Sequence, residues 1–121
     1  MTVREHTVTE LRYSKDEKCL TVAFDDGASF DLPAEYLRVY SPSAEVRGHG
    51  ADERRIIAGR RHVGIMKIEP VGNYAVKIDF DDLHDTGLYS WSYFRELGEK
   101  RETWWAQYLK DLEDRGLSRD P

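Results

Sequence analysis

The strongest constraint on the fold is a run of alternating apolar residues that stops at an Asp-Asp-Gly turn. Leu20, Val22 and Phe24 occupy every second position of this run, and the sequence Asp-Asp-Gly follows at 25–27. Such alternation is typical of a strand with one buried face, and the turn signal is typical of a hairpin. The sequence therefore predicts a β-hairpin over 19–32.

Three further segments have strand-like patterns, at 6–13, 63–69 and 73–80. In the last of these, alternation places four apolar side chains on one face: Tyr74, Val76, Ile78 and Phe80. The connections are too short for crossover helices, so we expect an antiparallel sheet.

Helix signals flank these strands. Pro33 suits the first position of a short helix, and Ser90 suits the N-cap of a helix over 90–97, with Gly98 in a left-handed conformation after its end. A final helix should end at Gly116 and present one apolar stripe, made of Trp104, Trp105, Tyr108, Leu109 and Leu112. The predicted class is α+β: a single domain over 1–121, with a small mainly antiparallel sheet, short helices, a C-terminal amphipathic helix and a polar tail at 117–121.

The sequence also contains a weak internal echo. Residues 20–38 and 76–97 both read as strand, Phe-Asp-Asp turn, strand and helix, with an aromatic residue shortly before the last arginine. Two such units side by side predict one sheet flanked by helices.

Composition excludes several classes of protein. A length of 121 residues fits one domain, and a formal charge of −5 argues against nonspecific nucleic-acid binding. Cys19 is the single cysteine, so neither an internal disulfide nor a CxxC metal or redox pair can form. No run approaches the ~18 apolar residues of a membrane span, and the first residues are too charged for a signal peptide. We expect a cytoplasmic protein.

The segment 40–50, YSPSAEVRGHG, is the most unusual stretch, and its proline and two glycines favour a loop. The region 47–62 adds five arginines against two acidic residues, a local charge of 5 − 2 = +3. We predict an ordered surface loop whose serine hydroxyls satisfy backbone donors and whose charged side chains face a protein partner. The predicted partner-binding residues are Ser41, Ser43, Glu45, Arg47, His49, Arg54, Arg55, Arg60 and Arg61.

No complete catalytic motif is present, so we expect no enzymatic activity. Ser41 and Ser43 lack a surrounding G-x-S-x-G turn, and the chain has no glycine-rich phosphate loop. We expect no resident cofactor. The alternative is a metal site with nitrogen and oxygen ligands, made of His49, Asp82, His84 and Asp85. The other interpretation of His84 is a ring held by a neighbouring carboxylate such as Asp85, and His6 and His62 are expected to be solvated.

Four stretches carry a resemblance to a known family: FDDG, LPAEYLRVYSPSAEVRGHG, EPVGNYAVKIDFDD and HDTGLYSWSYFREL. Over about residues 6 to 115 the chain resembles the γ-butyrobetaine-hydroxylase-like N-terminal domain family, also called DUF971. That resemblance implies a small β-rich domain that occurs alone, in front of certain 2-oxoglutarate-dependent hydroxylases, or attached to P-loop scaffold ATPases of iron–sulfur cluster assembly. It implies an accessory module rather than a catalyst.

The resemblance also bears on zinc. In the hydroxylases the domain resembles a zinc carrier, with three cysteines after a Leu-Arg pair and one later histidine. Here Leu37–Arg38 is followed by VYSPSAEV, without cysteine, while His84 matches the histidine. Serine hydroxyls do not replace thiolates as zinc ligands, so the resemblance implies a lost zinc site.

The expected function is therefore a non-catalytic adaptor that binds a protein partner, with an iron–sulfur assembly ATPase as the candidate. One alternative is a metal-binding accessory domain that holds iron or zinc. A second is RNA or phosphate binding through the arginine-rich segment. Neither a membrane nor DNA is an expected partner.

Overall fold

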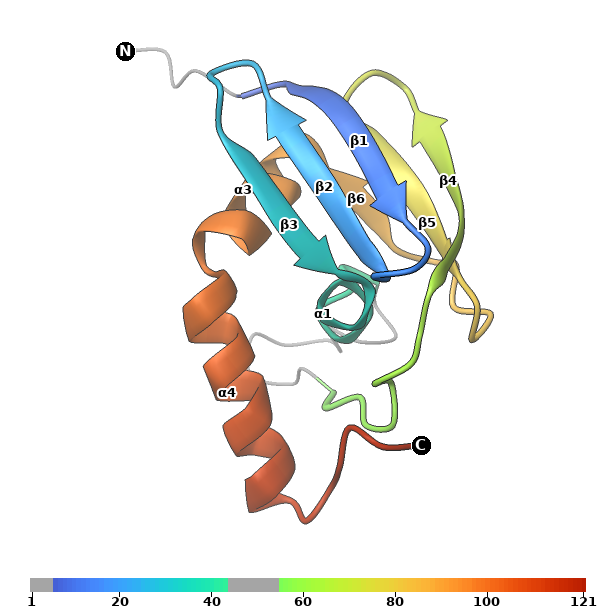
Figure 1. The fold of residues 1–121 in the computed structure, drawn as a ribbon, viewed down its shortest axis with the longest axis vertical. Coiled ribbons are helices and arrows are strands. Elements are labelled where there is room, and N and C mark those ends of the chain that lie inside the picture. Colours follow the sequence, from blue (N-terminus) through green and yellow to red (C-terminus); the bar gives the residue numbers. More distant parts are fainter. Residues whose placement is uncertain (1–5, 44–54) are drawn as a thin grey trace.

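The computed structural model describes residues 6–43 and 55–121, and it confirms the α+β class. Figure 1 shows the strands and the helices that flank them. The strands are β1 Val8–Ser14, β2 Cys19–Phe24, β3 Ser29–Pro33, β4 Ile65–Val71, β5 Ala75–Phe80 and β6 Leu88–Ser90. The helices are α1 Ala34–Val39, α3 Trp91–Glu99 and α4 Arg101–Asp114.

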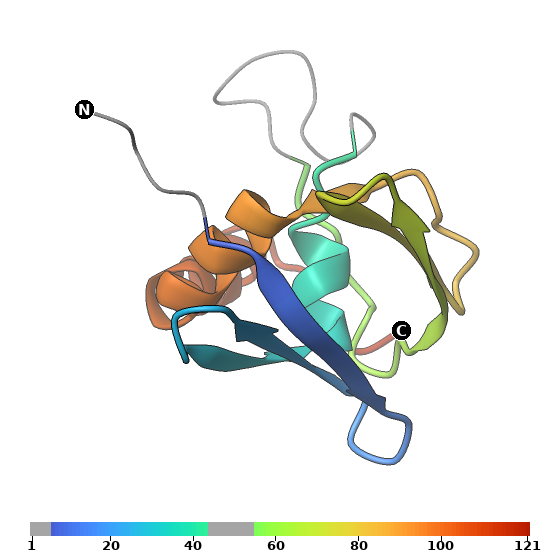
Figure 2. The same cartoon turned by 90° about the horizontal axis from the view of Figure 1, so that it is seen from above.

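The strands form two sheets rather than the one that we expected. Each sheet has three antiparallel strands, in the orders β1-β2-β3 and β4-β5-β6. Figure 2 shows α1 near the centre of the molecule, between the two sheets, and all six of its residues are buried. The expectation of a single sheet is wrong because each half pairs only with itself and packs a separate apolar face on this central helix.

The internal echo is present in the structure as a repeated unit. Both halves consist of three sequential antiparallel strands followed by a helix, β1-β2-β3-α1 and β4-β5-β6-α3. The first strand of each half has a register irregularity near its start, between Val8 and Glu10 and between Ile65 and Lys67. The repeat therefore includes a first strand that the sequence comparison did not reach.

Tyrosine hydroxyls join the two halves reciprocally. The hydroxyl of Tyr36 in α1 donates to the carbonyl oxygen of Leu97 in α3 at 2.7 Å. The hydroxyl of Tyr93 in α3 donates to the carbonyl oxygen of Tyr40, just after α1. Each tyrosine thus donates to a carbonyl near the end of the other half's helix. In both cases the accepting residue lies four positions after the other tyrosine.

One core is shared by both halves and by α4. Its fully enclosed side chains include Leu20, Leu32, Leu37, Ile78, Phe80, Tyr89, Phe94 and Leu97. Tyr108 and Leu112 of α4 are buried, whereas Leu109 is 39% exposed, so the predicted stripe is narrower than expected. Tyr74 is also exposed, at 56%, because it lies before the start of β5.

The helix ends confirm the predictions for Ser90 and Gly116 and contradict the one for Gly98. The Ser90 hydroxyl accepts a hydrogen bond from the Tyr93 amide at 3.2 Å, and Gly116 has the positive φ of +65° that suits the end of α4. Gly98, in contrast, lies inside α3. A Cβ at this position would lie 2.4 Å from the ring of Phe30, so this glycine allows β3 and α3 to approach each other.

Adding that methyl group is expected to destabilise the fold. Gly98→Ala should lower the free energy of unfolding by about 1–3 kcal/mol, because overpacking forces the Phe30 ring out of place. Urea unfolding of Gly98→Ala, Phe30→Leu and the double variant measures this. The double variant should recover part of the loss, and a stability equal to that of the unaltered protein would contradict the packing argument.

The segment 117–121 packs against the domain, whereas its polar sequence predicted only a polar tail. The carbonyl oxygens of Ser118 and Arg119 accept hydrogen bonds from the amides of Gly59 and Arg61, both at 2.9 Å. Figure 1 shows this end of the chain returning beside the segment that follows residue 55. Among the residues that the structure describes, no helix is long and apolar enough to cross a membrane.

Candidate functional site

A buried polar cluster joins the segment after α1 to the loop between β5 and β6. Ser41 is fully buried and His84 is 7% exposed, and a 2.9 Å hydrogen bond links Ser41 Oγ to His84 Nε2. Beside them, Ser43 Oγ is hydrogen-bonded to Thr86 Oγ1 at 2.7 Å. These four residues, which we call the Ser41–His84 cluster, connect positions 43 residues apart in the chain.

Gly87 makes this close approach possible. A Cβ at Gly87 would lie 2.5 Å from Ser41 Oγ and 3.2 Å from the Tyr89 ring. Any larger residue would therefore push the β5–β6 loop away from Ser41. The Thr86-Gly87 pair was visible in the sequence, but nothing there indicated which residue approaches the glycine.

The structure places the two serines inside the fold rather than on an exposed surface. Ser41 has no exposed area and Ser43 is 5% exposed, so neither presents its side chain to a partner. The predicted backbone role is confirmed for Ser41, whose Oγ accepts a hydrogen bond from the Ser43 amide at 3.3 Å. Their hydroxyls hold the loop in place from within.

Asp82 forms a second polar centre in the same loop. Its Oδ2 accepts a hydrogen bond from Arg38 Nε at 2.7 Å, and Arg60 Nε lies equally close to the same oxygen. The Arg60 contact is an ion pair without an aligned hydrogen bond, since this Nε has no partner of hydrogen-bond geometry among the residues described. Asp82 Oδ1 accepts from the His84 amide at 3.1 Å, which ties this centre to the Ser41–His84 cluster.

These contacts shift the acidity of Asp82. Burial works to raise the pKa of its carboxyl. The hydrogen bonds from Arg38 and from the His84 amide, together with the guanidinium charges, outweigh burial, and the pKa lies below its usual value. The carboxylate is therefore ionised at neutral pH and serves as a fixed negative centre.

This shift makes stability sensitive to acid. Because the pKa is lowered in the folded state, the carboxylate stabilises the fold above its unfolded-state pKa of about 3.9, and the contribution is lost as pH falls through the folded-state pKa. Urea unfolding between neutral pH and the acid range should show a shallower pH dependence for Asp82→Asn than for the unaltered protein. Asp85→Asn, which changes an exposed carboxylate of the same loop, is the control. Equal slopes for both variants would contradict the assignment.

The alternative metal site does not assemble in the described part of the chain. His84 Nε2 is engaged by Ser41, Asp82 is held by arginines, and Asp85 is exposed. These three residues do not bring three ligand atoms together. The ring of His84 is held by Ser41 rather than by Asp85. Among the residues described, the zinc site of the resembled hydroxylases does not fit either, because the side chains that the structure places with His84 are the hydroxyls of Ser41, Ser43 and Thr86 rather than thiolates.

The structure describes three of the five arginines in the predicted surface, and two of these form ion pairs within the domain. Arg60 pairs with Asp82, and Arg61 Nε bonds Asp120 Oδ1 at 2.5 Å. Arg55 is exposed. The remaining predicted residues lie outside those that the structure describes: Glu45, Arg47, His49 and Arg54.

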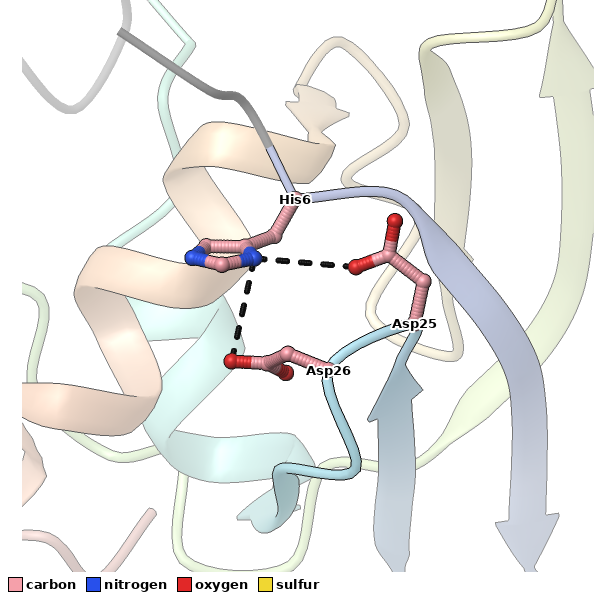
Figure 3. Close-up of side chains that lie close together, drawn as sticks. All are labelled: His6, Asp25 and Asp26. Carbon is pink, nitrogen blue, oxygen red and sulfur yellow. Dashed lines mark ion pairs between the residues drawn. The ribbon is translucent and has the colours of Figure 1, made fainter.

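Sequence reasoning missed another cluster, made of His6, Asp25 and Asp26 (Figure 3). His6 Nδ1 lies 3.6 Å from Asp25 Oδ1 and 3.7 Å from Asp26 Oδ2. His6 was expected to be solvated, but only 34% of its side chain is exposed. The internal echo could have drawn attention to these aspartates, since Asp25-Asp26 follow β2 as Asp81-Asp82 follow β5.

The comparisons place this architecture in a family. Residues 11–95 match the model of the family described as "Gamma-butyrobetaine hydroxylase-like, N-terminal". The chain belongs to this family. A comparison with curated proteins finds no match.

Solved structures support membership in the Gamma-butyrobetaine hydroxylase-like N-terminal family. Two NMR solution structures are 44% and 45% identical, each with a TM-score of 0.85, and they cover 98% and 100% of this chain and 93% and 92% of their own. A crystal structure of a DUF971 protein of unknown function from Acidithiobacillus ferrooxidans is 34% identical, with a TM-score of 0.65. That match covers 76% of this chain and 92% of the other.

Proposed function

We propose that this protein is a non-catalytic accessory module that binds a protein partner through the β5–β6 loop and the adjoining face of α3. The observation that carries the proposal is that polar and apolar side chains of this loop face opposite ways. Its reactive side chains, His84 and Asp82, are turned inward and engaged, whereas Leu83 between them is 81% exposed. An inward polar anchor and an outward apolar residue suit recognition rather than catalysis.

Leu83 is also held in an unusual backbone conformation. Its φ is +73°, a left-handed value that L-residues with large side chains rarely adopt. Bonds on both sides hold the turn, from the Leu83 amide to the Phe80 carbonyl at 3.0 Å and from the Phe80 amide to the His84 carbonyl at 3.0 Å. Strain that the surrounding structure maintains at an exposed apolar residue supports a binding role.

A hollow begins at Leu88, the residue that follows this loop, and extends to α3. It has a volume of about 510 Å³ and is lined by Pro42, Leu88, Ser90, Ser92, Tyr93 and Glu96. Leu88 is 48% exposed at its edge. Exposed apolar side chains beside polar ones are the usual composition of an interface core and rim.

The family resemblance suggests the partner and the compartment as further parts of this proposal. The candidate partner is a P-loop ATPase of iron–sulfur cluster assembly, in the cytoplasm. The RNA alternative has less support, because Arg60 and Arg61 are ion-paired within the domain.

Site-specific photocrosslinking in the native host tests the proposal. A photoreactive residue at position 83 or 88 should give a specific adduct with one protein, whereas the same residue at Glu113, an exposed site on α4, should not. Leu83→Asn removes the apolar side chain but tolerates the left-handed backbone, so it should lose partner capture and keep its stability. Equal adducts at positions 83 and 113, or capture unchanged in Leu83→Asn, would contradict the proposed face.

A further inference from the structure

We propose that His6, Asp25 and Asp26 form a binding site for a divalent transition-metal ion such as Zn²⁺. His6 precedes β1, and the two aspartates lie in the turn after β2, so one hairpin edge carries all three (Figure 3). This site lies in the first half of the chain and is separate from the Ser41–His84 cluster.

The spacing of the three ligand atoms is the first argument. His6 Nδ1 is 3.6 Å from Asp25 Oδ1 and 3.7 Å from Asp26 Oδ2, and all three atoms lie within 4.8 Å of one another. These separations are too long for hydrogen bonds. Metal–ligand bonds of about 2.0–2.2 Å in a tetrahedron place ligand atoms about 3.3–3.6 Å apart. The two histidine–carboxylate separations lie within a few tenths of an ångström of these values, and the two carboxylate oxygens lie within 4.8 Å of each other.

The state of the imidazole nitrogen is a second, independent argument. His6 Nδ1 is shielded from solvent and has no hydrogen-bond partner among the residues described. A shielded polar atom without a hydrogen bond is rare, and the two carboxylates that face this nitrogen at ion-pair distance are suitable co-ligands for an ion. Figure 3 shows this nitrogen directed at both carboxylates.

The carboxylates are held in position by the rest of the fold. Asp26 Oδ1 accepts hydrogen bonds from the Ala28 amide and from Arg95 Nη1, both at 3.1 Å, which leaves Oδ2 for the His6 side. The amide of Asp25 is fixed by the Thr7 carbonyl at 2.9 Å. Arg95 also pairs with Glu99 at 3.0 Å, so its positive charge is shared and does not fall on Asp26 alone.

The second half of the chain provides an internal comparison. There the corresponding turn carries Asp81 and Asp82, and the arginines Arg38 and Arg60 occupy Asp82 Oδ2. In the first half, among the described residues, only His6 is ion-paired with Asp26 Oδ2. In the second half, a second guanidinium, that of Arg60, contacts the aspartate oxygen. In the first half, the corresponding oxygen faces the imidazole of His6.

The donor set indicates the class of ion. One imidazole and two carboxylates suit Zn²⁺, Co²⁺ or Ni²⁺, whereas Ca²⁺ and Mg²⁺ prefer oxygen ligands alone. Three protein ligands leave a fourth position for water or for a donor from a bound partner. The site would give this half of the domain a second recognition element besides the β5–β6 loop.

Calorimetric titration of the full, untagged chain with ZnCl₂ near neutral pH tests the site. We expect about one Zn²⁺ per chain, and a loss of affinity of roughly tenfold or more in His6→Ala and in Asp25→Asn. His62→Ala changes the histidine beside the corresponding turn of the second half and should bind like the unaltered protein. Visible absorption of the Co²⁺ form should change in His6→Ala, which reports ligation by that imidazole.

Several results would overturn the site. These are no zinc uptake by the unaltered chain, unchanged affinity in both His6→Ala and Asp25→Asn, or an equal loss in His62→Ala. His6→Gln, together with circular dichroism, covers the case in which His6→Ala folds poorly. If folded His6→Gln retains full zinc affinity, His6 is no ligand and the proposal fails.

Discussion

Replacing Asp82 by alanine is expected to lower the free energy of unfolding by about 3–5 kcal/mol, the cost typical of breaking a buried ion pair. The side chain of Arg38 is 8% exposed, and its guanidinium would lose the carboxylate that neutralises it. Arg60 would lose the same partner, and the His84 amide would lose its acceptor. The variant therefore leaves charge inside the fold instead of simply removing a contact.

Urea unfolding measures this effect, and the repeated architecture supplies the control. Asp26→Ala removes the corresponding aspartate of the first half, which pairs with Arg95 at the surface, so its loss of stability should be clearly smaller. Adding Arg38→Met to Asp82→Ala should restore part of the stability, because the more deeply buried of the two unpaired charges is then gone. If Asp82→Ala and Asp26→Ala lose equal stability, Asp82 is no buried charge centre.

The two ion pairs show how the halves are joined. Asp82, after β5, pairs with Arg38 of α1, and Asp26, after β2, pairs with Arg95 of α3. Each aspartate thus contacts the helix of the other half, as the tyrosine hydroxyls of α1 and α3 also do. The β5–β6 loop is consequently fixed by both halves, which supports its proposed role as a rigid recognition element.

The strands and their turns could be predicted from the sequence, because alternation and turn residues act locally. Leu20, Val22 and Phe24 had to share a buried face, and Ser90 was an evident cap. The division into two sheets could not be predicted, because it depends on which strands pair across the whole chain. Gly98 illustrates the same limit, since a glycine at a helix end and a glycine against a Phe30 ring look alike in sequence.

The candidate sites were predicted less well, for a related reason. Ser41 and His84 were both singled out, but their contact spans 43 residues, and no spacing rule links them. Hydroxyls in a loop look exposed in sequence, whereas the structure buries both serines and places Gly87 directly against Ser41. His6 was dismissed because it lies near the start of the chain, where the neighbouring residues gave no sign of the aspartates that contact it.

The tail provides the second large prediction. Arg119→Ala is expected to cost about 3 kcal/mol, at the lower end for a buried pair because Arg119 is itself 29% exposed. Its guanidinium donates two hydrogen bonds to Glu35, at 2.7 and 2.8 Å, and lies 5.1 Å from the centre of the Trp105 ring. The side chain of Glu35 is 7% exposed, so its charge would be left unpaired within the fold.

Thermal and urea unfolding of Arg119→Ala measure the loss, and Arg115→Ala, at an exposed position just after α4, is the matched control. Adding Glu35→Gln to Arg119→Ala should recover part of the stability, because an amide tolerates burial without a cation better than a carboxylate does. Arg119→Lys should be more stable than Arg119→Ala but less stable than the unaltered protein, because lysine cannot form both hydrogen bonds of the guanidinium. If Arg119→Ala and Arg115→Ala are equally stable, the contacts of Arg119 with Glu35 and Trp105 carry no net stabilisation.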